Sequence, residues 1–307
     1  MIKSLHWYLR ASLLCYLLIS VSGARILPKP RAKKDDSPML FFQATNDHHT
    51  IYLFGSIHGM FQAHAGYPLP TRILEKLYQS DLLIYDAPLS PEDEALFQRT
   101  SRSTLEWNEI IDFQQIQFLE ALIDSLELPE ESKQTLRSYH PWLLLQIFYQ
   151  LIVAESGYMS TEERDVFIEH AKEHRITMKP LHLAPIESDF IAYISSKYGA
   201  ILYTWVHTQL QFIEAKVNLP EALQKAWMRG DVETVLDLLV VSRNPSFSEL
   251  KDDELHLYQR INHEILSAIQ ENPDAKTIFI TLDASYLLDD GGFIAILEQE
   301  GFIIQPA

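Results

Sequence analysis

His58 and Asp86 stand at equivalent points in the sequence, each at the end of a short apolar run. The first run, Ile51–Ile57, is rich in β-branched and aromatic residues, as is typical of a buried strand. A second run over Leu82–Tyr85 follows a helical stretch at Thr71–Ser80 and leads into Asp86. Ligand-binding side chains in open α/β sheets gather at the carboxyl ends of strands, so we expect His58 and Asp86 to lie close together. An imidazole and a carboxylate in that position could bind a divalent metal ion.

Each of these two residues also has an ordinary structural explanation. A lone histidine beside a glycine is often a hydrogen-bonded structural residue, and an aspartate after a strand commonly caps a turn. The pair at matching strand ends is therefore a stronger indication of a functional site than either residue alone.

The run Tyr52–His58, the helix after it and the Ser80–Asp86 strand together resemble the amino-terminal signature of the TraB/PrgY/GumN family. That signature reads Leu-x-Gly-Thr-x-His, then a helix, then Ser-Asp and an apolar strand ending in Glu. The Tiki proteases carry a related Gly-x-x-His signature. In the family, this histidine and glutamate form a metal-dependent hydrolytic site with a second Gly-x-x-His near the carboxyl terminus. Gly55 and His58 match the pattern, and Asp86 stands where glutamate is usual.

The carboxyl-terminal part of the chain has the order of elements that the resemblance implies. A strand over Ile278–Asp283 is followed by a glycine turn at Asp289–Gly292, a short helix over Phe293–Glu300 and a last strand at Phe302–Ile304. The resemblance therefore extends over about Phe41 to Gln305. In the middle of the chain, a Pro-Trp pair opening a helix and a Trp-x-x-Gly-Asp turn add to it.

The site residues that the resemblance implies are changed at this end of the chain. Tyr286 occupies the place of the second histidine, because Asp283-Ala-Ser-Tyr286 replaces Gly-x-x-His. Asp283 could compensate as a ligand beside His58 and Asp86. Arg260, in the preceding helix, corresponds to an arginine of the family.

The resemblance leads to two hypotheses about function. The first is a metal-dependent hydrolase acting on peptides, in which His58, Asp86 and Asp283 bind Mn²⁺, Co²⁺ or Zn²⁺. Tyr286 would then donate a hydrogen bond to an oxyanion, because a neutral phenol is a poor ligand. The second is a non-catalytic descendant that keeps the cleft and binds a peptide or another exported ligand. A serine hydrolase is disfavoured, because no Gly-x-Ser-x-Gly elbow is present.

Two further histidine positions offer possible metal ligands. His170-Ala-Lys-Glu173-His174 fits the inverted zincin pattern His-x-x-Glu-His on a predicted helix over Thr161–Arg175. Its charged neighbours and its place in the last helical turn indicate a solvated face rather than a catalytic centre. His182 ends a predicted strand over Ile176–Leu183, where the family has an acidic residue nearby, and could be either a ligand or a core residue.

The predicted fold class is α/β, with a central mixed β-sheet flanked by helices and a large helical insertion. An apolar content of 47% in 307 residues is ample for a packed core. A β-hairpin is expected from Met39 to Ser56, with His48 and His49 in its turn. Helical insertions are expected at about 91–175 and 188–270, and they include one amphipathic helix from Ile110 to Leu126. Residues 39–307 would form a single domain.

The amino terminus has the features of a secretory signal. Lys3 and Arg10 make the first ten residues basic. The run Ala11–Val21 that follows is apolar but short for a membrane span, and Ser22-Gly-Ala24 offers a cleavage site. We therefore predict cleavage after Ala24, with residues 25–38 as a flexible leader and no stable membrane span afterwards. The expected location is the bacterial periplasm or the exterior.

Cysteine and charge content narrow the chemistry of the mature chain. The single cysteine, Cys15, lies inside the predicted signal, so neither a disulfide nor a cysteine nucleophile is expected. The formal net charge of −17 becomes −19 when Lys3 and Arg10 are removed with the signal. A surface this acidic disfavours nucleic acid as a partner.

Overall fold

The computed structural model describes residues 39–57, 61–62, 69–155, 158–159, 163–214 and 219–307. The predicted signal peptide and leader lie outside these ranges, and so does His58. The described residues form two compact units. One unit comprises Pro88–Gly157 and Ala184–Leu219, and the other comprises Pro28–Ala87, Tyr158–Leu183 and Pro220–Ala307. We call them the helical unit and the sheet unit.

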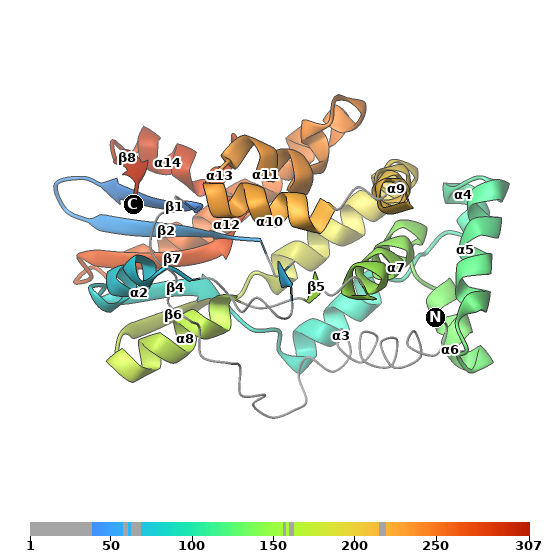
Figure 1. The fold of residues 1–307 in the computed structure, drawn as a ribbon, viewed down its shortest axis with the longest axis horizontal. Coiled ribbons are helices and arrows are strands. Elements are labelled where there is room, and N and C mark those ends of the chain that lie inside the picture. Colours follow the sequence, from blue (N-terminus) through green and yellow to red (C-terminus); the bar gives the residue numbers. More distant parts are fainter. Residues whose placement is uncertain (1–38, 58–60, 63–68, 156–157, 160–162, 215–218) are drawn as a thin grey trace. The chain divides into compact units, whose positions relative to one another are not determined.

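The sheet unit is built on a six-stranded mixed sheet (Figure 1). Its strands, in spatial order, are β6 (Thr177–Leu181), β4 (Leu82–Asp86), β7 (Thr277–Asp283), β2 (Thr50–Ser56), β1 (Phe41–Thr45) and β8 (Ile303–Pro306). The first four strands run parallel, and β1 is antiparallel to both β2 and β8. The prediction of an α/β fold with a central mixed β-sheet is confirmed, and the apolar strands β2, β4, β6 and β7 all lie in that sheet.

The hairpin of β1 and β2 closes through a local turn set by Asn46. Its Oδ1 accepts hydrogen bonds from the backbone N–H groups of His48 at 2.9 Å and His49 at 2.8 Å. An asparagine side chain that bonds its own following backbone stabilises such a turn without tertiary help. The two histidines lie in this turn, as the sequence predicted, at the starting end of β2.

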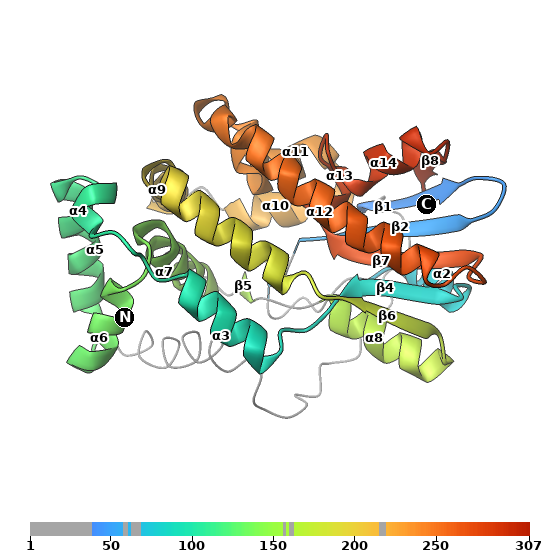
Figure 2. The ribbon, with the colours of Figure 1, turned by 180° about the vertical axis from the view of Figure 1, so that it is seen from behind.

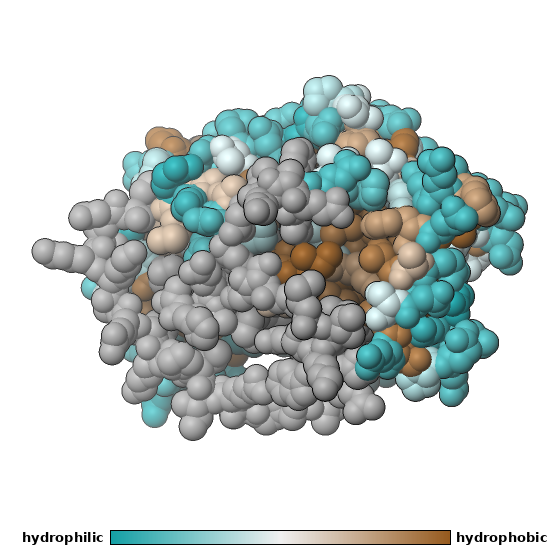
Figure 3. Space-filling model, turned by 45° about the vertical axis from the view of Figure 1, so that its right-hand side comes forward, coloured by the Kyte–Doolittle hydropathy of each residue, from teal (hydrophilic) through white to brown (hydrophobic). Residues whose placement is uncertain are grey.

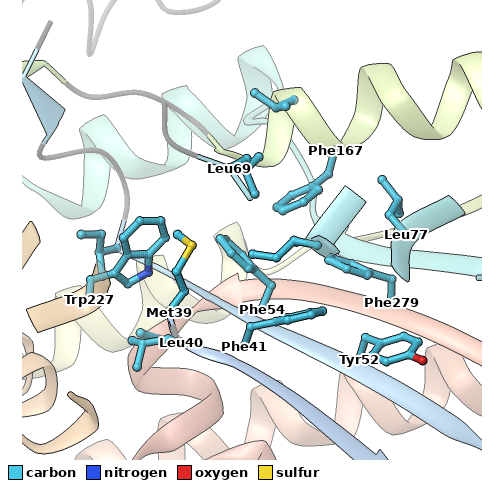
Figure 4. Close-up of a cluster of buried hydrophobic side chains, with 14 of the residues drawn as sticks. Met39, Leu40, Phe41, Tyr52, Phe54, Leu69, Leu77, Phe167, Trp227 and Phe279 are labelled. Carbon is cyan, nitrogen blue, oxygen red and sulfur yellow. The ribbon is translucent and has the colours of Figure 1, made fainter. Parts of the chain in front are cut away.

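One face of the sheet carries an aromatic core, drawn in Figure 4. Phe54 of β2 contacts Phe167 of α8 (Glu163–His174) with ring centroids 5.0 Å apart, and Trp227 of α10 (Leu219–Arg229) at 5.8 Å. Phe279 of β7 lies between Phe41 and Phe167 at 5.8 and 5.1 Å. Helix α2 (Thr71–Tyr78) adds apolar side chains to the same cluster. Each such buried side chain stabilises the fold by about 1.5–3 kcal/mol.

The opposite face is covered by α12 (Lys251–Gln270), which contacts β6 and crosses the side of the sheet seen in Figure 2. Its buried residues recur at three- and four-residue intervals, as one face of a helix requires. Burial on both faces explains why the parallel strands are nearly continuously apolar. The buried apolar residues of α12 are Leu257, Tyr258, Ile261, Ile265 and Ala268.

Shorter elements complete the sheet unit. They are β3 (Phe61–Gln62) paired with β5 (Tyr158–Met159), α11 (Val232–Leu239), the 3-10 helices η1 (Val241–Arg243) and η2 (Pro245–Leu250), α13 (Ala284–Leu288) and α14 (Phe293–Gln299). The turn before α11 follows the prediction, because Gly230 has a φ of 67° and Asp231 caps the helix by accepting from the Thr234 N–H.

The helical unit consists of α3 (Pro91–Thr100), α4 (Trp107–Ile110), α5 (Phe113–Ser125), α6 (Glu130–Arg137), α7 (Pro141–Glu155) and α9 (Ala184–Glu214). Inside it, the Trp142 indole N–H donates to Ser195 Oγ at 2.9 Å and so joins α7 to α9. The single helix predicted from Ile110 to Leu126 is wrong. Asp112 and Gln115 form a reciprocal capping box that ends α4 and starts α5.

The boundaries of the predicted helical insertion also differ from those observed. Helix α8 packs with β4 and β6, and α10, α11 and α12 belong to the sheet unit. The insertion is therefore Pro88–Gly157 with Ala184–Leu219 rather than 91–175 with 188–270. An amphipathic pattern shows that a helix has an apolar face, but it does not show which partner covers that face.

Hydrophilic residues occupy much of the described surface in the view of Figure 3, in keeping with a charged-residue content of 22%. Within the residues that the structure describes, no helix has both the length and the apolar content that a membrane span needs.

Candidate functional site

The carboxyl ends of three neighbouring parallel strands define the candidate site, which we call the strand-end site. Tyr85 of β4 pairs with Thr281 of β7, so Asp86 and Asp283 end adjacent strands. On the other side of β7, Ser56 of β2 pairs directly with Asp283. The chain leaves β2 at this edge two residues before His58, which itself lies outside the described residues. Among the described residues, the strand-end site thus comprises Ser56, Asp86 and Asp283.

Gly55 fixes the backbone of β2 immediately before this site. A Cβ at this position would lie 3.3 Å from Leu40 Cβ and 3.4 Å from the backbone of Ala284, so only glycine allows this approach without a shift. The Gly55 N–H donates to the Leu40 carbonyl at 2.9 Å, and its carbonyl accepts from the Trp227 indole N–H at 2.7 Å. The glycine of the family signature therefore has a packing role here.

Asp283 ends β7 and caps the short helix α13. Its Oδ1 accepts hydrogen bonds from the Ser285 N–H at 2.7 Å and from Ser285 Oγ at 2.5 Å. The residue is half-buried. One carboxylate oxygen is therefore already used to hold the turn between β7 and α13.

Asp86 faces a guanidinium group that the sequence analysis did not single out. Nη1 of Arg164, at the start of α8, lies 3.8 Å from Asp86 Oδ2 and donates to the Asp86 and Ala87 carbonyls at 3.3 Å each. Both side chains are largely buried, at 15% exposure for Arg164 and 24% for Asp86. The position of Arg164 in the first turn of α8 was a signal in the sequence. A cation there interacts unfavourably with the helix dipole, so its presence indicates that an acidic partner lies elsewhere in the fold.

Arg260 lies on α12, the helix that precedes β7 in the sequence, and Tyr286 lies on α13, the helix that follows it. The ring of Tyr286, in α13, packs edge-on against Tyr258 of α12, with centroids 6.1 Å apart. Burial raises the pKa of the Tyr258 hydroxyl well above its usual value, so that phenol stays neutral. Arg260 is exposed on α12. The structure thus places Tyr286 within one helical turn of Asp283 and places Arg260 on the surface.

The described donors of the strand-end site fit a divalent metal ion poorly. The Arg164 guanidinium lies against Asp86, where it would repel a second cation. Asp283 Oδ1 is engaged by two donors of Ser285. A tightly held ion would require these contacts to rearrange.

A mixed sheet, with acidic residues at the ends of its parallel strands and helices on both faces, defines an α/β protein with its candidate site at the carboxyl edge. The TraB/PrgY/gumN family model matches residues 40–306, so the chain belongs to this family. No curated protein sequence and no solved structure matches it.

Proposed function

We propose that this chain is an exported, non-catalytic member of its family that binds a peptide or another small exported ligand at the strand-end site. The observation that carries the proposal is the contact of Asp86 with Arg164, because it places a protein cation where a hydrolase would need its metal. The hydrogen bond by which Asp283 caps α13 also supports a non-catalytic protein, because one oxygen of this second carboxylate already stabilises the helix.

The charges at this edge favour a ligand with an amino group. Asp86 and Asp283 bring two carboxylates to adjacent strand ends, whereas Arg164 Nη1, 3.8 Å from Asp86 Oδ2, is the one cation among the described residues that we place at this edge. A net charge of −17 over the whole chain also disfavours anionic ligands. The amino terminus of a peptide would form charge-assisted hydrogen bonds with the carboxylate of Asp283, beside those that this carboxylate already accepts from Ser285.

The second candidate is the metal-dependent hydrolase, which the register of the three strand ends favours. His58, Asp86 and Asp283 would hold Mn²⁺, Co²⁺ or Zn²⁺, and such an ion supplies Lewis-acid polarisation of a carbonyl and an activated water. Tyr286 would donate to the developing oxyanion. Arg260 would contribute positive charge near the substrate.

Calorimetric titration distinguishes the two candidates. The non-catalytic proposal predicts that a short peptide with a free amino terminus binds, and that its N-acetylated form binds at least about tenfold more weakly. Asp283→Asn should weaken binding of the free peptide by a similar factor. Hydrolysis of either peptide by the metal-loaded wild-type protein, measured by mass spectrometry, would overturn the proposal in favour of the hydrolase.

Restoring the family's residues tests the assignment of the site itself. Tyr286→His with Asp86→Glu should strengthen Mn²⁺ or Co²⁺ binding, because imidazole is a better donor than a protonated phenol. Adding His58→Ala should remove that gain. All proteins in this series carry His170→Ala and His174→Ala, so that a second group of histidines does not contribute. If the restored protein binds metal no better than its parent, the site is wrongly assigned.

Export is tested separately by intact-mass measurement of the protein recovered from the cell envelope. The proposal predicts a chain that starts at Arg25, because Ser22-Gly-Ala24 supplies the small residues that a signal peptidase reads. A mass that retains Met1–Ala24 would contradict it.

A further inference from the structure

The last turns of α8 bring together three metal-binding side chains that the strand-end site does not use. His170, Glu173 and His174 each offer one ligand atom, and these atoms lie within 4.8 Å of one another. Residues three and four apart lie on one side of a helix, so the arrangement follows directly from the spacing. Among the described residues, no other group of histidine, aspartate and glutamate meets this distance criterion.

The ring of His174 is held in the form that a metal ligand needs. Its Nδ1 lies 2.9 Å from the carbonyl oxygen of His170. A carbonyl can only accept a hydrogen bond, so this contact places the proton on Nδ1 and leaves the lone pair on Nε2. Metal-bound histidines in proteins are commonly oriented by such a bond from the other ring nitrogen.

A neighbouring helix fixes both imidazole rings. Tyr78, the last residue of α2, stacks on His174 with centroids 3.8 Å apart and an interplanar angle of 18°. Its hydroxyl lies 3.0 Å from Nδ1 of His170. A phenol can both donate and accept, so the Tyr78 hydroxyl can serve as a hydrogen-bond partner of His170 Nδ1. Positions fixed in this way reduce the entropy lost when an ion binds.

We propose that His170, Glu173 and His174 form a surface site for Zn²⁺, with Tyr78 as the positioning residue. Two imidazole nitrogens and one carboxylate oxygen are a donor set that zinc prefers, and they leave the remaining coordination position to solvent. The site is open, because Glu173 is 70% exposed and His170 is 24% exposed. The bound ion would join three residues of the last turns of α8, and its binding free energy would add to the stability of the sheet unit.

The ordinary explanation of the same residues is an aromatic stack without metal. In that case, the histidines would cover Tyr78 and complement the carboxyl end of the helix dipole. Zinc would then bind no better here than at other surface histidines. The chain offers a matched comparison in His48 and His49, which lie in the β1–β2 turn with ring centroids 6.5 Å apart.

Isothermal titration with Zn²⁺ of the full chain, stripped of metal with a chelator, tests the proposal. The wild-type protein should bind Zn²⁺, His170→Ala/His174→Ala should lose that isotherm, and His48→Ala/His49→Ala should keep it. Tyr78→Phe keeps the ring but removes the hydroxyl, and should weaken binding by about tenfold.

Circular dichroism checks that each variant is folded, and a Co²⁺ spectrum reports metal ligation directly. A His58→Ala variant separates this site from the strand-end site. Each variant must show the wild-type helical signal, and Co²⁺ should give a visible d–d absorption in the wild type that is lost in His170→Ala/His174→Ala. His58→Ala should leave Zn²⁺ binding unchanged. The proposal is overturned if the wild type binds no Zn²⁺, if His170→Ala/His174→Ala binds it with unchanged affinity, or if binding disappears with His58→Ala or with His48→Ala/His49→Ala.

Discussion

Glu254 is a buried carboxyl group in the sheet unit, and it makes stability depend on pH in an unusual direction. It is 8% exposed, on α12, and accepts a hydrogen bond from Ser242 Oγ. Burial raises its pKa above the usual 4.5, the negative charge of Asp289 raises it further, and the Ser242 hydrogen bond partly opposes them. Arg243 does not neutralise Glu254, because it pairs with Asp289 at 2.9 Å and with Glu233 at 2.8 Å.

The sign of the effect follows from which state holds the proton. Below about pH 4.5, Glu254 is protonated in both the folded and the unfolded chain. Between that pH and the raised pKa, the folded chain keeps the proton and the unfolded chain loses it. The free energy of unfolding therefore falls as the pH rises through this interval, with a limiting slope of about 1.4 kcal/mol per pH unit. Above the raised pKa the contribution is constant and unfavourable.

Glu254→Gln removes this dependence while keeping an oxygen that accepts from Ser242. The variant should be close to wild type in stability at about pH 4, and it should become progressively more stable than wild type toward neutral pH, with the slope given above. Other titrating groups are common to both proteins, so the difference between the two urea midpoints isolates Glu254. The exposed residue Glu298 offers a control, because Glu298→Gln should shift the midpoint little at any pH.

Unfolding of the sheet unit can be followed separately with 5-fluorotryptophan. Trp227 is fully buried in the sheet unit, whereas Trp107, Trp142 and Trp205 lie in the helical unit. Its ¹⁹F resonance, assigned with a Trp227→Phe variant, reports the urea midpoint of the unit that contains Glu254. A stability difference that stays constant with pH, or that favours the wild type as the pH rises, would refute the reasoning.

Three further substitutions test the packing around the sheet. Trp227→Phe leaves the buried Gly55 carbonyl without its 2.7 Å donor and opens a small cavity. Thermal unfolding should therefore show a free energy of unfolding lower by about 2–4 kcal/mol, and a decrease below about 1 kcal/mol would contradict this. Gly301→Ala should cost about 1 kcal/mol in urea unfolding, because φ is +81° with nothing near the added Cβ, and Gly301→Asn should cost less. Asp81→Ala removes an acceptor that bonds two N–H groups at the start of β7 at 2.9 Å each, and should cost about 1 kcal/mol by calorimetry, with Asp81→Asn between it and wild type.

The strands could be predicted because their signals are local. The apolar runs at β2, β4 and β7 are bounded by turn residues, and the Asn46 turn that closes the hairpin is contained within four residues. The break between α4 and α5 was also local, in the capping box of Asp112 and Gln115. It was missed because the apolar periodicity continues across it. Helix α13 was missed because a five-residue helix capped by Asp283 has no periodic pattern of its own.

The candidate site shows the same division between local and distant signals. Parallel strands place their carboxyl ends at one edge, so the placement of Asp86 and Asp283 at adjacent strand ends followed from the predicted topology. The contact between Asp86 and Arg164 did not, because it joins residues 78 positions apart and no spacing rule connects them. That contact changes the chemistry expected of the site, since it sets a protein cation against a predicted metal ligand.

The sequence by itself determined the α/β class, the family, and the places where histidines and carboxylates follow strands or share a helix face, because these features depend on composition and short spacing. It also contained the His170–His174 pattern, but it could not decide whether that pattern was more than a solvated helix end. Only the tertiary structure brought Tyr78 against both imidazoles and Arg164 against Asp86. The physical reason is that these contacts arise from packing between elements distant in the chain, where burial and charge are set by neighbours that the local sequence does not specify.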